Sequence, residues 1–157
     1  MNDLEKFQRK LKKFDIHAVL KEVWKEPRVQ IYIESLITEG QPTSQLFEKG
    51  EDGRGVSFGD YSLTTILGTS KFEGKLSKGQ RIDHITLKDT GDFYETYFVT
   101  PLINGFEVGA DGLKEDGNDL FKIYGKDITL LNEQNKILLA IFIQPFFDQK
   151  AAQALSQ

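Results

Sequence analysis

The chain contains no cysteine among its 157 residues, and several common signatures of enzyme chemistry are also missing. Without cysteine there is no disulfide scaffold, thiolate nucleophile, cysteine-containing zinc site or cysteine-ligated cluster. The two histidines form neither an H-x-x-x-H nor an H-E-x-x-H pattern, and a metal site needs three or four convergent ligands. No glycine-rich loop ends in the Gly-Lys-Ser/Thr sequence that cradles phosphate. The sequence therefore favours a protein that is not an enzyme and uses no cofactor.

Long hydrophobic runs are also lacking. The longest, Ile137 to Ile143, is about a third of the roughly 20 apolar residues that a membrane-spanning helix requires. The N-terminus is charged and has no apolar stretch, which predicts that no signal peptide is present. Hydrophobic residues make up 39% and charged residues 28% of the chain, as in ordinary globular domains. We expect one soluble domain over residues 1–157, with no membrane partner.

The net charge of −4 is unevenly distributed along the chain. Residues 1–28 carry eight Lys/Arg and five Asp/Glu, whereas the remainder carries twelve and nineteen. Neutralising nucleic-acid phosphates requires clustered cations, so an acidic body argues against a protein whose main task is gripping nucleic acid.

Helical periodicity dominates the first 40 residues. Apolar residues at steps of three and four predict a first helix, after which Asp15 is suited to cap a second helix and Pro27 to begin a third. The apolar positions of the first helix are Leu4, Phe7, Leu11 and Phe14. Gly40 and Pro42 then end the helical region.

The rest of the chain predicts loops, a small sheet and a last helix. Residues 41–81 are glycine-rich and polar and predict extended loops, with Tyr61 to Leu67 readable as either a short helix or a strand. Residues 82–131 predict a small sheet: a strand at 85–87, and a hairpin made of 94–100, a turn at 101–105 and 106–110. Asn118 is suited to cap a short helix that Gly125 ends. A helix from about Asn132 fills 132–157, with a kink or break at Pro145.

The fold class that this order predicts is α+β. It comprises N-terminal helices, a small antiparallel sheet with a β-hairpin, long loops and a C-terminal helix.

Asp83 and His84 are the strongest candidates for chemistry. His84 adjoins the expected strand, and together with Asp83 and Asp89 it could serve a metal-assisted hydrolase or nuclease. A structural histidine is the competing interpretation.

The segment Asp89-Thr90-Gly91-Asp92-Phe93-Tyr94 is interpreted as an architectural turn. Asp89 or Thr90 can accept hydrogen bonds from the amides that follow, and Gly91 allows a sharp reversal. Phe93 or Tyr94 then enters the core, and this arrangement requires no chemistry.

The same region resembles a motif of small structural proteins from phages and prophages of the Bacteroides group. In that group a Lys-Gly-Gln segment and an Asp-x-(Ile/Val)-Thr-Leu-x-Asp-Thr-Gly-Asp-Phe-Tyr string precede a hairpin. Here Lys78-Gly79-Gln80 and the run from Asp83 to Tyr94 match it. The run Tyr124-Gly125-Lys126-Asp127-Ile128 and, further on, Leu131-Asn132-Glu133-Gln134-Asn135 are similar to a second string of the group, with Asn132 in place of its usual Thr. The resemblance spans about residues 27–145 and extends more loosely to neck and tail-completion proteins.

The resemblance implies a non-enzymatic virion structural protein, made in the host bacterial cytoplasm. It would be a ring subunit of the neck or head–tail connector, or a tail-completion protein, that joins head to tail around the DNA channel. The implied partners are copies of itself in a ring and neighbouring portal, connector or tail proteins. A transient assembly chaperone is a further interpretation.

Two groups of residues are candidates for assembly contacts. A basic loop could face a neighbour's acidic surface or make non-specific contact with packaged DNA, or it could simply be solvated; its cations are Lys71, Lys75, Lys78 and Arg81. Phe146 and Phe147, beyond Pro145, either dock into a partner groove or cap the core. We expect truncation after Gln144 to leave a folded body that cannot assemble.

Overall fold

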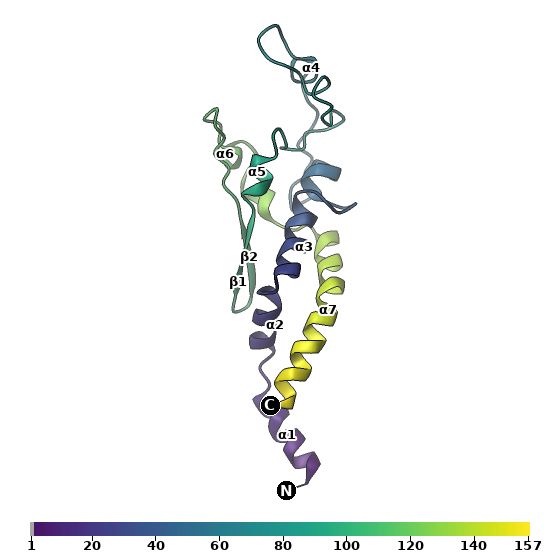
Figure 1. Cartoon of the computed structure of the whole chain (residues 1–157), viewed down its shortest axis with the longest axis vertical. Coiled ribbons are helices and arrows are strands. Elements are labelled where there is room, and N and C mark those ends of the chain that lie inside the picture. The colour runs from purple at the N-terminus through teal and green to yellow at the C-terminus, as the bar shows by residue number, and fades with distance from the viewer. Residues whose placement is uncertain (1) are drawn as a thin grey trace.

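A computed structural model describes residues 2–157 as an elongated molecule with helices at one end and loops at the other (Figure 1). The predicted α+β class is confirmed, because a single two-stranded antiparallel sheet accompanies the helices in the described part of the chain. The long helices are α1 (Asp3–Lys13), α2 (Ile16–Trp24), α3 (Pro27–Ile37) and α7 (Glu133–Ser156). None of the helices over residues 2–157 is both long and apolar enough to cross a membrane.

The second and third helices begin where the sequence predicts, and the first begins at a cap that the sequence analysis does not name. Asn2 and Glu5 form a reciprocal capping box at the start of α1. The Asp15 carboxylate accepts hydrogen bonds from the amides of His17 and Ala18 and so caps α2. Pro27 occupies the first turn of α3, where no amide donor is needed.

The last helix, α7, runs through Pro145 without ending, so of the predicted kink or break the break is wrong. Tertiary packing on both sides of the proline explains this result. The Phe142 ring stacks on Tyr32 of α3 with a centroid distance of 3.9 Å, and Phe146 packs against Phe142. Pro145 itself is exposed, so its ring lies on the outer face of the helix.

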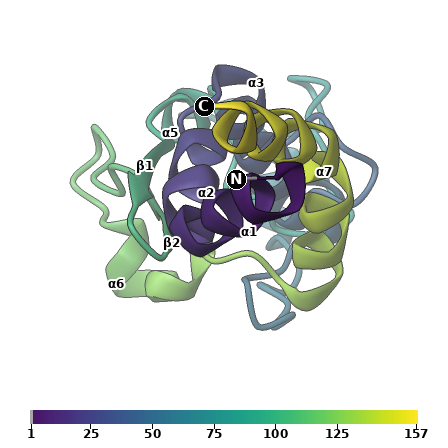
Figure 2. The ribbon, with the colours of Figure 1, turned by 90° about the horizontal axis from the view of Figure 1, so that it is seen from below.

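The hairpin consists of β1 (Phe98–Leu102) and β2 (Gly105–Gly109), paired so that Val99 faces Val108. The predicted hairpin is confirmed, but its turn is shorter than expected because Pro101 lies within β1. A two-stranded sheet has only edge strands, and these tolerate a residue without an amide donor. The hairpin packs against α2, where Phe106 meets Trp24 at 5.0 Å between ring centroids. Figure 2 shows α7 and the hairpin on different sides of α2.

Short elements and irregular segments fill the middle of the chain. The expected strand at 85–87 is wrong: the segment is irregular, and Leu87 has a φ of 58°. The first part of the expected strand at 94–100 is also wrong, because it belongs to a helical turn, and Asp119 rather than Asn118 caps the helix that follows. These short elements are η1 (Gln45–Lys49), α4 (Leu63–Leu67), α5 (Asp92–Glu95), α6 (Leu120–Tyr124) and η2 (Lys126–Thr129).

The hydrophobic core lies where α2, α3, α7, the hairpin and η1 meet. Its fully buried side chains are Val23, Val29, Ile33, Leu36, Ile37, Leu46 and Ile128. A buried polar contact joins the start of α7 to the end of α3: the Asn135 side-chain amide donates to the Leu36 carbonyl at 2.9 Å and to the Thr43 carbonyl at 3.0 Å. The core therefore ties both chain halves into one body.

Candidate assembly surfaces

Helix α1 has no buried residue and projects from the body beyond the end of α7 (Figure 1). Its apolar stripe faces solvent, with exposed fractions of 63% for Leu4, 50% for Phe7 and 47% for Leu11. An amphipathic helix normally turns this stripe toward a core. The apolar face of α1 therefore lacks a partner within residues 2–157.

The contact that α1 makes with the body uses its basic side. The Lys10 ammonium donates to the Ser156 carbonyl at the end of α7, with 3.3 Å between the two atoms. Lys6 and Lys13 line the same depression between α1 and the end of α7. Because the basic side faces the body, the apolar stripe points away from it.

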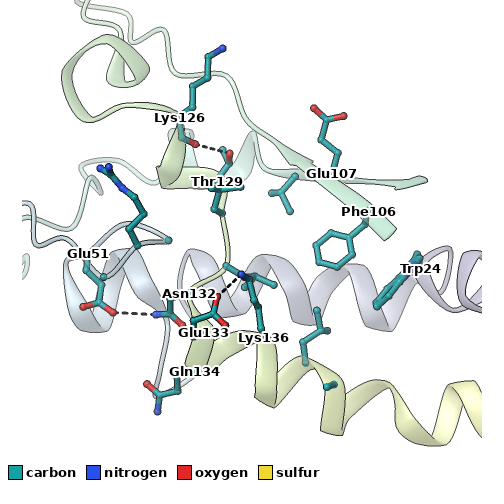
Figure 3. A pocket seen from close by; sticks show the side chains of 18 of the residues that line it. Trp24, Glu51, Phe106, Glu107, Lys126, Thr129, Asn132, Glu133, Gln134 and Lys136 are labelled. Carbon is teal, nitrogen blue, oxygen red and sulfur yellow. Dashed lines mark hydrogen bonds and ion pairs between the residues drawn. The ribbon is translucent and has the colours of Figure 1, made fainter. Parts of the chain in front are cut away.

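A groove with a volume of about 1150 Å³ lies between the hairpin and the N-terminal half of α7 (Figure 3). The loop at 51–55 and the chain leading into α7 close its other end. Apolar and polar residues line it in similar numbers, and the apolar ones are Trp24, Leu102, Phe106, Val108, Leu130, Leu131, Leu139, Ala140 and Ile143. A protein surface with such a concave apolar patch is suited to binding.

Charged residues surround this apolar groove. Glu133 pairs with Lys136 at 2.6 Å, and Glu51 accepts a hydrogen bond from the Asn132 side chain at 3.1 Å. Glu107 also lines the groove, with its side chain on the opposite side of β2 from Phe106 in Figure 3. Trp24 lines the groove, and its buried Nε1 group has no hydrogen-bond partner among the described residues.

The loop at 51–55 is fixed by Asp52, whose side chain is almost fully buried. Its carboxylate accepts hydrogen bonds from the amides of Arg54 at 2.8 Å and Val56 at 3.0 Å, and pairs with the Arg54 guanidinium. Burial alone would raise the pKa of Asp52, but these donors together lower the pKa below its usual range. Arg54 also reaches Asp127 at 2.8 Å, which joins the loop to η2.

The basic loop is not one free cationic patch. Lys75 is buried and donates to the Lys88 carbonyl at 2.8 Å, and Lys78 lies 3.7 Å from Asp89. Arg81 pairs with Glu48 at 2.8 Å and Asp83 at 2.7 Å, and these carboxylates raise its pKa. Lys71 is exposed and forms no ion pair within the described chain.

Phe146 and Phe147 are half-buried and pack against the core rather than standing free. The Arg28 guanidinium lies over the Phe146 ring at 5.4 Å from its centroid. Of the two interpretations left open by the sequence, the structure shows the pair covering the core.

The turn segment is built around Gly91, whose φ of 104° places it in the left-handed region. The Thr90 hydroxyl accepts a hydrogen bond from the Asp92 amide at 3.3 Å. Phe93 and Tyr94 are both buried, and the Tyr94 hydroxyl donates to the Thr86 carbonyl. Burial raises the pKa of Tyr94. The segment thus links the irregular stretch at 85–87 to the core.

Asp83, His84 and Asp89 do not converge on one site. The Nε2 atom of His84 bonds the Phe47 carbonyl at 2.9 Å, and its Nδ1 atom lies 3.2 Å from Asp83. Asp83 pairs with Arg81, which lowers the pKa of Asp83, whereas Asp89 contacts Lys75 and Lys78 instead. Over residues 2–157 no group of three or more His, Asp or Glu side chains is placed to hold a metal ion.

Ser57 stands in the sequence Gly55-Val56-Ser57-Phe58-Gly59, which fits a G-x-S-x-G pattern. In hydrolases this pattern places the serine on a sharp turn between a strand and a helix. Here the segment has only an isolated β-bridge between Glu51 and Ser57. The Ser57 hydroxyl accepts a hydrogen bond from the Gly59 amide at 3.1 Å. The local geometry is that of a loop turn.

The groove and the free stripe of α1 are the functional features that sequence reasoning missed. The sequence did carry a signal for α1, because its periodicity was clear, but not the information that the stripe stays uncovered. No signal identified the groove, since its lining comes from four separate segments. A scan against protein-family models finds no matching family, and searches of curated proteins and of solved structures find no match either.

Proposed function

We propose that this chain is a non-enzymatic structural protein of a phage virion. It serves as a ring subunit of the neck or head–tail connector, or as a tail-completion subunit, that joins head to tail around the DNA channel. Its partners in this role are copies of itself and neighbouring portal, connector or tail proteins.

The observation that carries the assembly part of this proposal is the uncovered apolar stripe of α1. Leaving three large apolar side chains in water on a projecting helix is unfavourable unless a partner covers them. The placement of the helix at one extreme of an elongated body suits a subunit that reaches its neighbours (Figure 1). The virion setting is supported by the sequence motifs, which resemble those of phage structural proteins.

Mass spectrometry of density-purified phage particles from the source culture tests the proposal. We expect the chain to be present at several to about a dozen copies per particle, as a ring subunit would be. A much higher copy number would instead indicate a capsid or tail-tube protein. Absence from intact particles would contradict a permanent structural role and would favour a transient assembly chaperone or a cellular protein.

The alternative of a metal-assisted hydrolase has its own test in His84→Ala. Because the His84 ring bonds the Phe47 carbonyl and fits against Gly50, we expect the variant to lose stability. If a hydrolytic activity of the purified chain disappeared while the variant kept its fold, the proposal would be wrong.

A further inference from the structure

We propose that the groove between the hairpin and α7 binds helix α1 of a second copy of this chain. This inference rests on the proposed assembly role and names the contact that performs it. It pairs the two unpartnered apolar surfaces described above, one on a projecting helix and one in a concave site.

The shape of each surface matches the other. Leu4, Phe7 and Leu11 follow an i, i+3, i+7 spacing, which is how an amphipathic helix anchors in a hydrophobic groove. The groove volume of about 1150 Å³ exceeds the roughly 300–1,000 Å³ of most small-ligand pockets. The groove is therefore large enough to accept several apolar side chains of one helix.

The charges also favour this pairing. Residues 2–14 carry five Lys/Arg and two Asp/Glu, whereas residues 15–157 carry fifteen and twenty-two. The groove itself is lined by three carboxylates and three cations, Glu51, Glu107, Glu133, Arg54, Lys126 and Lys136, so the excess of negative charge belongs to the body as a whole. A basic helix approaching this acidic body is attracted over long range.

The helix in its observed position does not occupy its own groove. Only Phe14 and Asp15 separate α1 from α2, and Asp15 caps α2 through two amide hydrogen bonds. The Lys10 contact to Ser156 holds α1 beyond the end of α7, away from the hairpin (Figure 1). The occupant to which the geometry points is therefore the α1 of a neighbouring copy.

This contact is head-to-tail, because the helix and the groove lie on different parts of the molecule. Such a heterologous interface repeats from copy to copy, and it closes into a ring if the rotation between neighbours allows. A pairwise symmetric dimer would instead require both contacts to form between the same two molecules.

Cysteine trapping tests the contact directly, because the chain contains no cysteine of its own. One chain carries Phe7→Cys and a second, distinguished by a size tag, carries Ala140→Cys, at an exposed position in the groove lining. A disulfide forms only when the two Cβ atoms come within roughly 3.5–4.5 Å. Leu4→Cys and Leu11→Cys, each mixed with Ala140→Cys, cover neighbouring registers along the helix. We expect a tagged–untagged heterodimer from at least one of these pairs under oxidising conditions.

The matched control is Arg9→Cys, on the opposite face of the same helix, which we expect to give no heterodimer with Ala140→Cys. Equal yields from Arg9→Cys and all the stripe variants would overturn the proposal. A chain carrying both Phe7→Cys and Ala140→Cys tests whether the helix folds into its own groove. If it does, that chain becomes a monomer with an internal disulfide. This outcome would also overturn the proposal.

Binding to vesicles provides the other decisive result. A basic amphipathic helix can also lie on an anionic membrane surface. We would therefore test whether the chain sediments with phosphatidylserine-containing vesicles, and whether Leu4→Gln and Leu11→Gln abolish this sedimentation. If both results are positive and no heterodimer is trapped, the stripe binds a lipid surface and the proposal is wrong.

The inference and the proposed function fail separately. If the chain is present in particles but no stripe variant is trapped in the groove, the virion role stands and this contact is wrong. If the heterodimer forms but particles lack the chain, the contact stands and the virion role is wrong.

Discussion

At the scale of single residues, Gly50 shows how a close contact dictates residue type. Its φ of 61° lies in the left-handed region, and a Cβ atom there would be 2.4 Å from the His84 ring. Gly55 has a similar φ of 76° but open space around it. We expect Gly55→Ala to cost about 1–2 kcal/mol from backbone strain alone. Gly50→Ala adds overpacking, so it should cost roughly 1–3 kcal/mol more.

Urea denaturation of both glycine variants measures this difference in the free energy of unfolding. Since both positions have a positive φ, the difference reports the close contacts of the added Cβ atom with the His84 ring and the Ile85 carbonyl oxygen. Equal losses would mean that both neighbours move aside and that Gly50 is needed only for its backbone conformation.

The buried carboxylate of Asp52 makes stability depend on acid pH. Because its pKa is lowered in the folded state, its contribution to stability is fully present above the unfolded value of about 3.9 and is lost as pH falls through the folded value. At pH 7 the free energy of unfolding of Asp52→Asn should be about 1–3 kcal/mol lower than that of the native chain. On acidification the variant should then lose less stability than the native chain does. Chemical denaturation between pH 7 and pH 2.5 checks both effects.

The matched control for Asp52 is Asp60→Asn, since Asp60 is exposed. Its unfolding free energy should follow that of the native chain across the whole pH range. Parallel pH curves for Asp52→Asn and the native chain would show that other carboxylates cause the acid sensitivity.

At the scale of elements, local signals were enough wherever a helix or hairpin follows from its own residues. Asn2 was not recognised as a cap, but the periodicity of Leu4 to Phe14, the Asp15 cap and Pro27 placed three helices correctly. The same reasoning did not predict that the helix continues through Pro145. Phe142 and Tyr32 are 110 residues apart in sequence, and the stacking of their rings holds the helix together. The segment at 85–87 was also predicted wrongly, since Thr86 and Leu87 are buried by tertiary contacts rather than paired in a sheet.

Asn135 connects α7 to residues at and beyond the end of α3, which are far from it in sequence. Its amide group satisfies two backbone carbonyls, of Leu36 and Thr43, inside the core. Asn135→Ala leaves both without this donor, and we expect a loss of roughly 3 kcal/mol in the free energy of unfolding. Gln134→Ala, at the exposed neighbouring position, should change stability by less than about 0.5 kcal/mol.

Thermal and urea unfolding of the two variants check this prediction. A cost for Asn135→Ala no larger than that of Gln134→Ala would show that water replaces the lost amide, and that the contact between α3 and α7 is held by apolar packing alone.

At the scale of the whole molecule, the sequence predicted the assembly residues less well than the fold. Cations such as Lys75 and Arg81 were grouped because they are close in sequence, but a loop folds back on itself and neutralises them with Glu48, Asp83 and Asp89. The groove could not be predicted because it exists only once the hairpin stands beside α7. Whether an apolar stripe is covered is a property of the complete body, not of the helix that carries it.

The two ends of the chain therefore contribute differently to the stability of the body. Deleting residues 2–13 removes a helix with no buried residue, and we expect the free energy of unfolding to change by less than about 0.5 kcal/mol. Truncation after Gln144 instead removes Phe146 and Phe147 from the core surface and the ion pair between Lys150 and Glu26. Burial of two half-covered phenylalanines corresponds to about 2–3 kcal/mol, so this truncation should leave a body that is less stable than the intact chain.

Thermal unfolding of both truncated chains, followed by circular dichroism at low protein concentration, separates the two effects. Low concentration matters because association through α1 would add stability to the intact chain by mass action. A lower midpoint for the chain that lacks residues 2–13, still seen at the lowest concentration, would mean that α1 folds against its own body in solution. The stripe of Leu4, Phe7 and Leu11 would then be covered within one molecule, and the assembly role would need another surface.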